Sequence, residues 1–370
     1  MAPSADIPLD SHSTPEIPIS TASRNTAPLR KSTALDSAFE FEDLTPTIGR
    51  EYLTARLIED ILNAPNADAL LRDLAITKVS ERGVVFFRAQ ESLTDDLQKN
   101  VILKLGELSG RPTSSSVHIH PTLNSHNEFG TSDAEISTIS SARRKKSYFA
   151  PERPSLRKNT RATEAAWHSD IQFEEVPADY TSLRIVQLPE NGGDTLWASG
   201  YDIYDRFSKP YQQLFDSLTA TYVGDGFLKA VAAGRAMLYE KARGSPANTG
   251  ARLSAVHPLV RTNPVTGWKS VFAIGNFPKY VNELDPEESE ELLRKFYSVI
   301  LDNHDLQVRF KWRNKNDIAI WDNRSVFHSA TFDFEGLGER AGHRVVGIGE
   351  KPFFDPSSKS KAEALAEASA

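Results

Sequence analysis

His168 and Asp170 are separated by one residue, in the tetrapeptide W-H-S-D that begins at Trp167. In a β-strand, residues two apart point to the same side, so this imidazole and this carboxylate could bind one metal ion from a common face. A third ligand would complete the facial triad that leaves coordination positions open in non-haem iron(II) oxygenases. Three-residue patterns often arise by chance, so this interpretation depends on a third ligand elsewhere in the chain.

His328 is the candidate for that third ligand, because it follows an apolar strand and a polar turn in D-I-A-I-W-D-N-R-S-V-F-H-S-A, residues 317–330. Arg340 and Arg344 come soon after it, in a segment that leads into the apolar run H-R-V-V-G-I-G. Guanidinium groups form bidentate bonds with carboxylates and sulfonates, so two of them beside a metal suit an enzyme that holds two small anions. One such arginine alone would be interpreted as part of a surface ion pair.

Short strands dominate the chain from Leu183 onward. Their sequences are L-R-I-V-Q-L, T-L-W-A-S, H-P-L-V-R-T, W-K-S-V-F-A-I, L-Q-V-R-F-K-W, D-I-A-I-W and H-R-V-V-G-I-G, and Gly, Pro and Asn separate them. So many short strands predict a sandwich or barrel. They do not alternate regularly with helices, so we expect a mainly β fold with peripheral helices and not a doubly wound sheet.

Helices are expected around this β core. Apolar residues recur at helical spacing between residues 50 and 80, and Thr94 can cap a further amphipathic helix. A third helix is predicted over residues 286–302, where Asp285 is the N-cap and Glu288 occupies the capping-box position.

The composition excludes several classes of protein. The chain has 370 residues, 39% of them hydrophobic and 25% charged, which is enough for one large domain or two modest ones. Its 50 acidic and 43 basic residues give a formal charge of −7, which argues against nucleic acid or an anionic membrane as the main partner. The absence of cysteine from the sequence excludes disulfides, zinc ribbons, iron–sulfur clusters and thiolate nucleophiles, so any metal must be bound by His, Asp or Glu.

Three segments stand apart from the predicted globular part. Residues 1–35 and 355–370 are predicted to be disordered tails around a single domain at 36–354. Residues 124–161 are rich in Arg and Lys and are predicted to be a basic loop insertion, either a solvated excursion or a lid over an anionic ligand. No apolar run is long enough to cross a bilayer and the N-terminus lacks a secretory signal, so we expect a cytoplasmic protein.

Five segments, taken in order, resemble the taurine dioxygenase (TauD/TfdA) family of Fe(II)- and 2-oxoglutarate-dependent dioxygenases. They are W-H-S-D-I-Q-F (167–173), L-P-E-N-G-G-D-T-L-W-A-S (188–199), H-P-L-V-R-T-N-P-V-T-G (257–267), N-D-I-A-I-W-D-N-R (316–324) and H-R-V-V-G-I-G-E-K-P (343–352). The resemblance implies a double-stranded β-helix, or jelly-roll, core. It also implies an enzyme that uses Fe(II), 2-oxoglutarate and dioxygen, with ascorbate as a possible stimulant.

The same resemblance assigns roles to individual residues. It implies that His168, Asp170 and His328 ligate the iron. It places Thr195, from the G-G-D-T turn, and Arg340 on the distal carboxylate of 2-oxoglutarate. The chain carries one residue more than the bacterial enzyme before Arg340, so this arginine is aligned from the pair that follows it, residues 343–344.

The resemblance also implies a binding site for the primary substrate. Arg344 falls where sulfonate-using members bind the anionic head, His120 matches a second contact to that head, and Phe277 matches an aromatic residue that faces the substrate. His118, two residues before His120, is expected to be uninvolved.

Two departures from the family pattern bear on the substrate. Leu123 and Glu164 stand where the taurine enzyme has a Tyr and an Asn near the amino end of taurine, so taurine itself does not follow. We expect a small organic anion, foremost an alkyl sulfonate that is hydroxylated and releases sulfite and an aldehyde. Sulfate esters and a larger carboxylate of secondary metabolism are alternatives, and a homo-oligomer is left open.

Two other classes of function compete with an oxygenase. Two histidines and an aspartate can also hold catalytic zinc, as in a hydrolase, although this leaves the paired arginines and the G-G-D-T turn unexplained. A non-catalytic β scaffold would be expected to have a broken triad, whereas this triad is complete in residue type.

Overall fold

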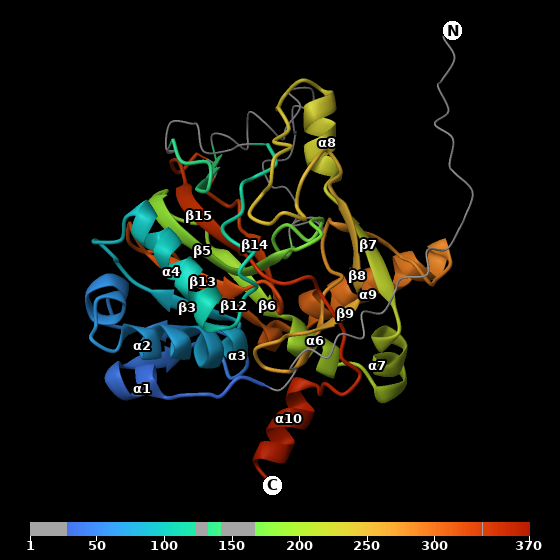
Figure 1. Cartoon of the computed structure of the whole chain (residues 1–370), viewed down its shortest axis with the longest axis horizontal. Coiled ribbons are helices and arrows are strands. Elements are labelled where there is room, and N and C mark those ends of the chain that lie inside the picture. The colour runs from blue at the N-terminus through green and yellow to red at the C-terminus, as the bar shows by residue number, and fades with distance from the viewer. Residues whose placement is uncertain (1–27, 123–131, 142–166, 335) are drawn as a thin grey trace.

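The largest sheet has seven strands, in the order β1-β2-β3-β13-β5-β15-β4. Figure 1 shows its central strands β3, β13, β5 and β15 side by side. The computed structural model describes residues 28–122, 132–141, 167–334 and 336–370. The strands of this sheet are β1 (Phe41–Asp43), β2 (Arg50–Tyr52), β3 (Val84–Phe87), β13 (Ile318–Asp322), β5 (Ala178–Gln187), β15 (Ala341–Ile348) and β4 (Ser137–Ser140). Strands β2 and β3 are parallel, and the other neighbouring pairs are antiparallel.

Three smaller sheets accompany it. One has the order β12-β6-β14, one has the order β11-β7-β8, and the third pairs β10 with β9. Their strands are β12 (Gln307–Phe310), β6 (Thr195–Ser199), β14 (Val326–Ala330), β11 (Pro278–Val281), β7 (Thr219–Val223), β8 (Ser254–Pro258), β10 (Lys269–Val271) and β9 (Val260–Thr262).

Helices lie around the sheets, and Figure 1 shows α1 to α4 gathered beside the large sheet while α7 and α9 lie on the other side of the molecule. The helices are α1 (Ala34–Ala38), η1 (Leu57–Leu62), α2 (Ala67–Asp73), η2 (Leu74–Val79), α3 (Ser80–Arg82), α4 (Asp95–Leu108), α6 (Gly200–Asp205), α7 (Lys209–Asp216), α8 (Asp225–Ala232), α9 (Pro286–Asp302), η4 (His304–Leu306) and α10 (Lys361–Ala368). In the described residues, no helix is both long and apolar enough to span a membrane.

Both faces of the large sheet are buried at its central strands, and strand β3 shows how. Val85 and Phe87 belong to the cluster that includes the apolar face of α4, whereas Val84 and Phe86 belong to the cluster that includes Trp197 of β6. Alternate side chains of one strand therefore fill two layers, and the strand is apolar along its whole length. The second layer, between the large sheet and β12-β6-β14, is the core of the expected jelly roll.

Two of the predicted helices follow their capping signals closely. Helix α4 begins after Thr94, whose side chain accepts a hydrogen bond from the backbone N–H of Leu97. Helix α9 spans Pro286–Asp302 with the reciprocal capping box of Asp285 and Glu288 in place. Both predictions are confirmed.

The prediction of a disordered C-terminal tail is wrong, because residues 361–368 form helix α10. Ser360 and Glu363 make a capping box at its start, and Lys361 Nζ donates to Asp202 Oδ2 at 2.9 Å. The polar, Ala-rich composition suggested disorder, but the cap and the ion pair anchor this helix beside α6.

The two other predicted segments also need correction. The N-terminal tail is predicted to extend to residue 35, yet Leu35 is fully buried and Leu29 N donates to Val265 O, so residues 29–35 belong to the folded domain. The predicted basic loop contains strand β4, which pairs with the edge of β15. Residues 1–27, 123–131 and 142–166 lie outside the described residues, and so do Leu123, Glu164 and the arginines and lysines between 142 and 161.

Candidate active site

His168 and His328 are joined by their backbones. His168 N donates to His328 O at 3.1 Å and His328 N donates to His168 O at 2.9 Å, which makes an isolated antiparallel bridge. The two ring centroids lie 4.3 Å apart. His328 is the central residue of β14, which pairs with β6 and so belongs to the small sheet of the jelly roll.

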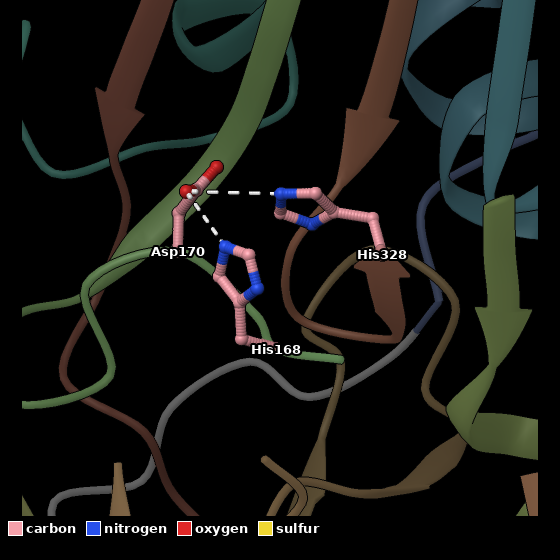
Figure 2. Close-up of side chains that lie close together, drawn as sticks. All are labelled: His168, Asp170 and His328. Carbon is pink, nitrogen blue, oxygen red and sulfur yellow. Dashed lines mark ion pairs between the residues drawn. The ribbon is translucent and has the colours of Figure 1, made fainter. Parts of the chain in front are cut away.

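The expectation that His168 and Asp170 lie on a regular strand is wrong. Only His168 forms a bridge, and the chain turns immediately afterwards, with Ile171 at a φ of 50°. Asp170 is nevertheless brought to the same place as the two histidines. Its Oδ1 lies 4.0 Å from His168 Nε2 and 4.0 Å from His328 Nε2 (Figure 2).

These three side chains fit a divalent metal ion. Their ligand atoms all lie within 4.8 Å of one another. Among the described residues, these three side chains form the group of His, Asp and Glu residues that could hold a metal ion. Asp170 Oδ2 is buried and has no hydrogen-bond partner in the part of the chain that the structure describes, as expected for a carboxylate that awaits a cation. Two imidazoles and one carboxylate are the donor set of mononuclear iron(II) oxygenases.

The electrostatics of the cluster also favour a cation. Burial, reinforced by the charge of His168, lowers the pKa of His328 to about 3, so its imidazole is neutral and its lone pair is available at neutral pH. Burial raises the pKa of Asp170, but Arg344 and the two imidazoles outweigh this and hold the pKa below its usual value. The carboxylate is therefore ionised near pH 7.

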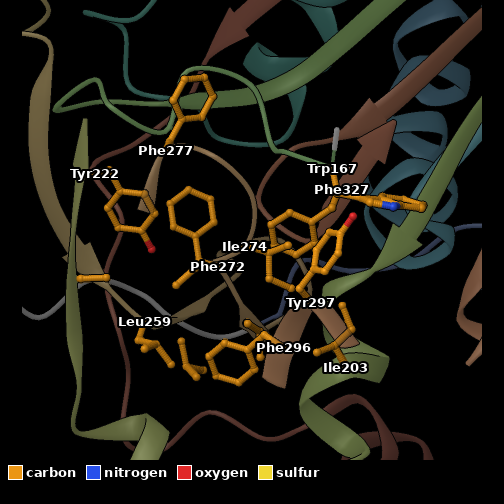
Figure 3. Packing of buried hydrophobic residues seen from close by; sticks show 14 of the residues in the cluster. Trp167, Ile203, Tyr222, Leu259, Phe272, Ile274, Phe277, Phe296, Tyr297 and Phe327 are labelled. Carbon is orange, nitrogen blue, oxygen red and sulfur yellow. The ribbon is translucent and has the colours of Figure 1, made fainter. Parts of the chain in front are cut away.

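Trp167 and Gly275 fix the start of the segment that carries His168 and Asp170. Trp167 is buried in the core cluster drawn in Figure 3, together with Phe277 and Phe327. Gly275 has a φ of 105°, and a Cβ there would lie 2.2 Å from Trp167 O. Glycine is therefore required where this loop passes the residue before His168.

Arg344 contacts the cluster directly. It lies on β15, and its Nη1 donates to Asp170 Oδ1 at 2.5 Å. Its Nε is buried without a hydrogen-bond partner among the described residues. Arg344, the arginine predicted to bind the substrate, therefore lies against the cluster of His168, Asp170 and His328. Its Nε is available to donate a hydrogen bond to a ligand.

Arg340 and Thr195 are brought together, as the sequence predicted. Arg340 Nη2 donates to Thr195 Oγ1 at 3.2 Å, and Arg340 Nε donates to Gly193 O at 2.7 Å. Trp312 Nε1 also donates to Thr195 Oγ1, at 3.1 Å. Burial lowers the pKa of Arg340 to about 10 against the opposing charge of Asp194, so the guanidinium is still positive at neutral pH.

His120 and Phe277 take part in a group of aromatic rings beside His168. The Phe277 centroid lies 6.3 Å from that of His168, and Phe227 of α8 lies 6.4 Å from Phe277 and 5.0 Å from His120. The ring centroid of Phe173 lies 5.1 Å from that of Phe277 and 5.4 Å from that of Phe227. These rings form an apolar wall next to the metal cluster.

His118 is engaged elsewhere. Its Nε2 lies 3.2 Å from Glu174 Oε1, and Glu174 accepts a bidentate pair of hydrogen bonds from the buried Arg243. This network ties the segment after Asp170 to the chain around residue 243.

Two residues near the cluster were not predicted. Phe227 belongs to the apolar wall, but one aromatic residue in a short helix carries no signal of its own. Asn323 donates to and accepts from several groups around Asp170. Asn323 lies in W-D-N-R, part of a segment that resembles the TauD/TfdA family. A polar residue in a turn after a buried strand is the sequence signal that could have identified it.

His257 supports the same segment and gives a pH prediction. Its Nε2 lies 3.1 Å from Gln172 O and 3.0 Å from Glu174 O, and burial with the charge of Arg261 lowers its pKa to about 4. In the unfolded chain the pKa of His257 is about 6.5. As the pH falls below that value, His257 binds a proton in the unfolded state but stays neutral in the folded state. Stability is therefore present above pH 6.5 and is lost on acidification.

We expect this one group to cost about 1 kcal/mol of unfolding free energy between pH 7 and pH 5.5. Chemical denaturation at the two pH values measures the loss. In His257→Gln, which cannot titrate, the loss should shrink by about that amount; an unchanged loss would contradict the assignment.

Comparison with known proteins gives consistent matches. The family model described as taurine catabolism dioxygenase TauD, TfdA family matches residues 40–346. The chain is 47% identical over 347 residues to the alpha-ketoglutarate-dependent dioxygenase btcD of Neocamarosporium betae, covering 91% of this chain and 98% of that protein. It is 31% identical over 318 residues to the alpha-ketoglutarate-dependent sulfonate dioxygenase of Saccharomyces cerevisiae, covering 84% and 67%.

A solved structure supports the fold. The crystal structure of a taurine dioxygenase from Burkholderia xenovorans superposes with a TM-score of 0.61 at 24% identity, covering 87% of this chain and 94% of that one. At this identity the match establishes the mainly β fold with its jelly-roll core.

Proposed function

Because the chain belongs to the TauD, TfdA family and is an alpha-ketoglutarate-dependent dioxygenase, we propose that it hydroxylates a small organic anion, foremost an alkyl sulfonate. The enzyme uses Fe(II), 2-oxoglutarate and dioxygen. Family membership sets aside the zinc hydrolase and the non-catalytic scaffold. We propose which residues bind the iron, the 2-oxoglutarate and the substrate, and which anion is the substrate.

His168, Asp170 and His328 would hold the iron, with two neutral nitrogens and one charged oxygen. When bound, Fe(II) lets dioxygen oxidise 2-oxoglutarate to succinate and carbon dioxide and hydroxylate a substrate carbon. The protein's own task is to place the reactants and to keep water away from them.

Arg340 and Thr195 would bind the distal carboxylate of 2-oxoglutarate. Gly193 O and Thr195 Oγ1 each accept a hydrogen bond from the guanidinium of Arg340, so the group is fixed before the co-substrate arrives. A buried, charged and preorganised guanidinium is a strong partner for a carboxylate.

The Nε of Arg344, which is buried and has no hydrogen-bond partner among the described residues, is the observation that favours an anionic primary substrate. This guanidinium already contacts Asp170 Oδ1, so an anion that it binds would lie beside the metal ligands. A buried donor without a partner is costly, and an acidic oxygen of the substrate would satisfy it. His120 would add a second polar contact to the same head.

A sulfonate explains the placement of the head group in chemical terms. Hydroxylation of the carbon next to sulfur gives a species in which the C–S bond breaks with its electron pair going to sulfur. The hydroxyl loses its proton and becomes a carbonyl, so the products are sulfite and an aldehyde. The relative from Saccharomyces cerevisiae, which is named a sulfonate dioxygenase, supports this choice.

A larger carboxylate is the second candidate, and the apolar wall of Phe173, Phe227 and Phe277 is the observation that favours it. Such a wall suits a substrate with an apolar body behind its anionic head. The relative from Neocamarosporium betae, at 47% identity, has a name that specifies no sulfonate.

A substrate screen separates these candidates. We expect the iron-loaded protein to form succinate in proportion to a sulfonate substrate, with an equal amount of sulfite released. Taurine, longer alkyl sulfonates, sulfate esters and aryloxy carboxylates should be compared under the same conditions. Succinate without sulfite, on the carboxylates alone, would replace the first candidate by the second.

A further inference from the structure

We propose that Asn323 is a positioning residue that holds Asp170 in the metal site, an inference that rests on the proposed iron ligands. Asn323 lies in the turn between β13, which ends at Asp322, and β14, which begins at Val326. The same hairpin carries His328. One turn would therefore support the ligands from both segments of the chain.

The oxygen of the Asn323 side chain collects donors from the loop that carries Asp170. Asn323 Oδ1 accepts a hydrogen bond from Asp170 N at 2.9 Å and one from Trp321 Nε1 at 3.2 Å. Ser169, the residue between the two ligands, donates from Oγ to Asn323 O at 2.8 Å and lies 3.4 Å from Oδ1. The loop is thus bound to the turn by both its backbone and a side chain.

The nitrogen of the same amide anchors the turn to the large sheet. Asn323 Nδ2 donates to Thr181 Oγ1 at 2.7 Å and to Asp179 O at 3.3 Å, and both residues lie on β5. Asn323 is 1% exposed, so its amide has no freedom to turn toward solvent. Asp179 O also accepts a hydrogen bond from Asn323 N at 2.8 Å, so the turn is held to β5 by its backbone as well as by the side chain.

Asp170 needs such a partner because the chain next to it is strained. Ile171 has a φ of 50°, in the left-handed region that a β-branched residue rarely adopts. A strained residue keeps its conformation only where its surroundings hold it. On the far side, Glu174 N donates to Ile171 O and Gln172 Nε2 donates to Phe272 O; on the near side, the bond from Asp170 N to Asn323 performs this role.

The two histidines do not share this dependence. His168 and His328 hold each other through reciprocal backbone hydrogen bonds. Among the described residues Asp170 has no comparable backbone pairing, and its side chain contacts Arg344, a residue that the proposed function assigns to the substrate. Loss of the Asn323 acceptor should therefore displace the carboxylate while leaving the pair of histidines in place.

The test compares iron affinity with stability in the full-length protein. Asn323→Leu removes the acceptor at similar size, and we expect its Fe(II) affinity to fall by about 10- to 100-fold, the range found for outer partners of metal ligands. The charge-transfer absorption of the Fe(II)–2-oxoglutarate complex should weaken in parallel. Asn323→Asp keeps an acceptor at the Oδ1 position and should retain the affinity within a few-fold.

Thr181→Val is the matched control, because it removes the partner of Nδ2 and leaves Oδ1 untouched. It should lower the thermal midpoint as Asn323→Leu does, with iron affinity preserved. Equal losses of iron affinity in Thr181→Val and Asn323→Leu, or none in either, would overturn the proposal. If Asn323→Leu does not fold, Asn323→Ala takes its place with the same expectation.

The wild-type protein distinguishes this failure from a failure of the proposed function. If the wild type binds Fe(II) and Asp170→Asn does not, the ligand assignment holds and the Asn323 series tests the positioning role alone. If Asp170→Asn binds Fe(II) like the wild type, the ligand assignment itself is wrong.

Discussion

Asp170→Asn should bind Fe(II) more than about 100-fold more weakly than the wild type, because even outer partners of metal ligands contribute 10- to 100-fold. The substitution keeps the shape of the side chain and removes the anionic oxygen that faces His168 Nε2 and His328 Nε2. Iron-dependent succinate formation should fall below detection. Calorimetric titration with Fe(II) under anaerobic conditions, followed by an assay for succinate, measures both effects.

Asp73→Asn is the matched control for this prediction. Asp73 is as buried as Asp170, and its Oδ2 accepts a hydrogen bond from Leu35 N far from the metal cluster. Its replacement should lower stability and leave iron affinity unchanged. Substantial turnover in Asp170→Asn at saturating iron would remove Asp170 from the metal site.

Arg340→Gln and Arg344→Gln should affect different reactants, which makes them a reciprocal pair. We expect Arg340→Gln to raise the KM for 2-oxoglutarate about 100-fold, since truncating a buried, charged hydrogen-bonding partner costs about 3 kcal/mol. The KM for the primary substrate should change little. Arg344→Gln should show the opposite pattern, with a large rise in the KM for the primary substrate.

Initial rates measured while each reactant is varied at saturating concentrations of the other provide the check. If Arg344→Gln raised the KM for 2-oxoglutarate and Arg340→Gln did not, the two arginines would have exchanged roles. Lysine at position 340 should restore part of the loss, because it keeps the charge but not the planar pair of donors.

The sequence predicted most accurately those elements whose signals are local. Helix α9 begins where Asp285, Pro286 and Glu288 indicate, because a cap depends on residues within one turn. The same kind of signal is present at Ser360 and Glu363, but the polar composition around them predicts a disordered tail, and the structure forms α10 there instead. In this segment the capping box indicates the local structure better than the composition does.

The metal cluster was predicted from residue types and from the family resemblance, and the structure brings His168, Asp170 and His328 together. The regular strand predicted over His168 and Asp170 is wrong, because only His168 forms a bridge and the chain turns at Ile171. The turn at Ile171 depends on buried contacts with residues far along the chain, such as Asn323. No local sequence pattern predicts these contacts. Close approach in space was predicted correctly, and the local backbone was not.

The contact between Arg344 and Asp170 illustrates a second limit. Sequence spacing places Arg344 on a strand near the metal cluster, but the side-chain hydrogen bond to Asp170 Oδ1 depends on how β15 packs against the loop after His168. Pairings between distant segments are set by the fold as a whole. They become visible only when the sheets are assembled.

The hairpin that carries Asn323 and His328 has a consequence for biosynthesis. It contacts the loop that carries His168 and Asp170, and the hydrogen bond from Ser169 to Asn323 joins residues 154 positions apart. During translation the loop leaves the ribosome long before the hairpin, and contacts of such long range form slowly. Until then the proposed ligands His168 and Asp170 would form an incomplete chelate, so we expect iron to be acquired after translation, when the last strands of the jelly roll have formed.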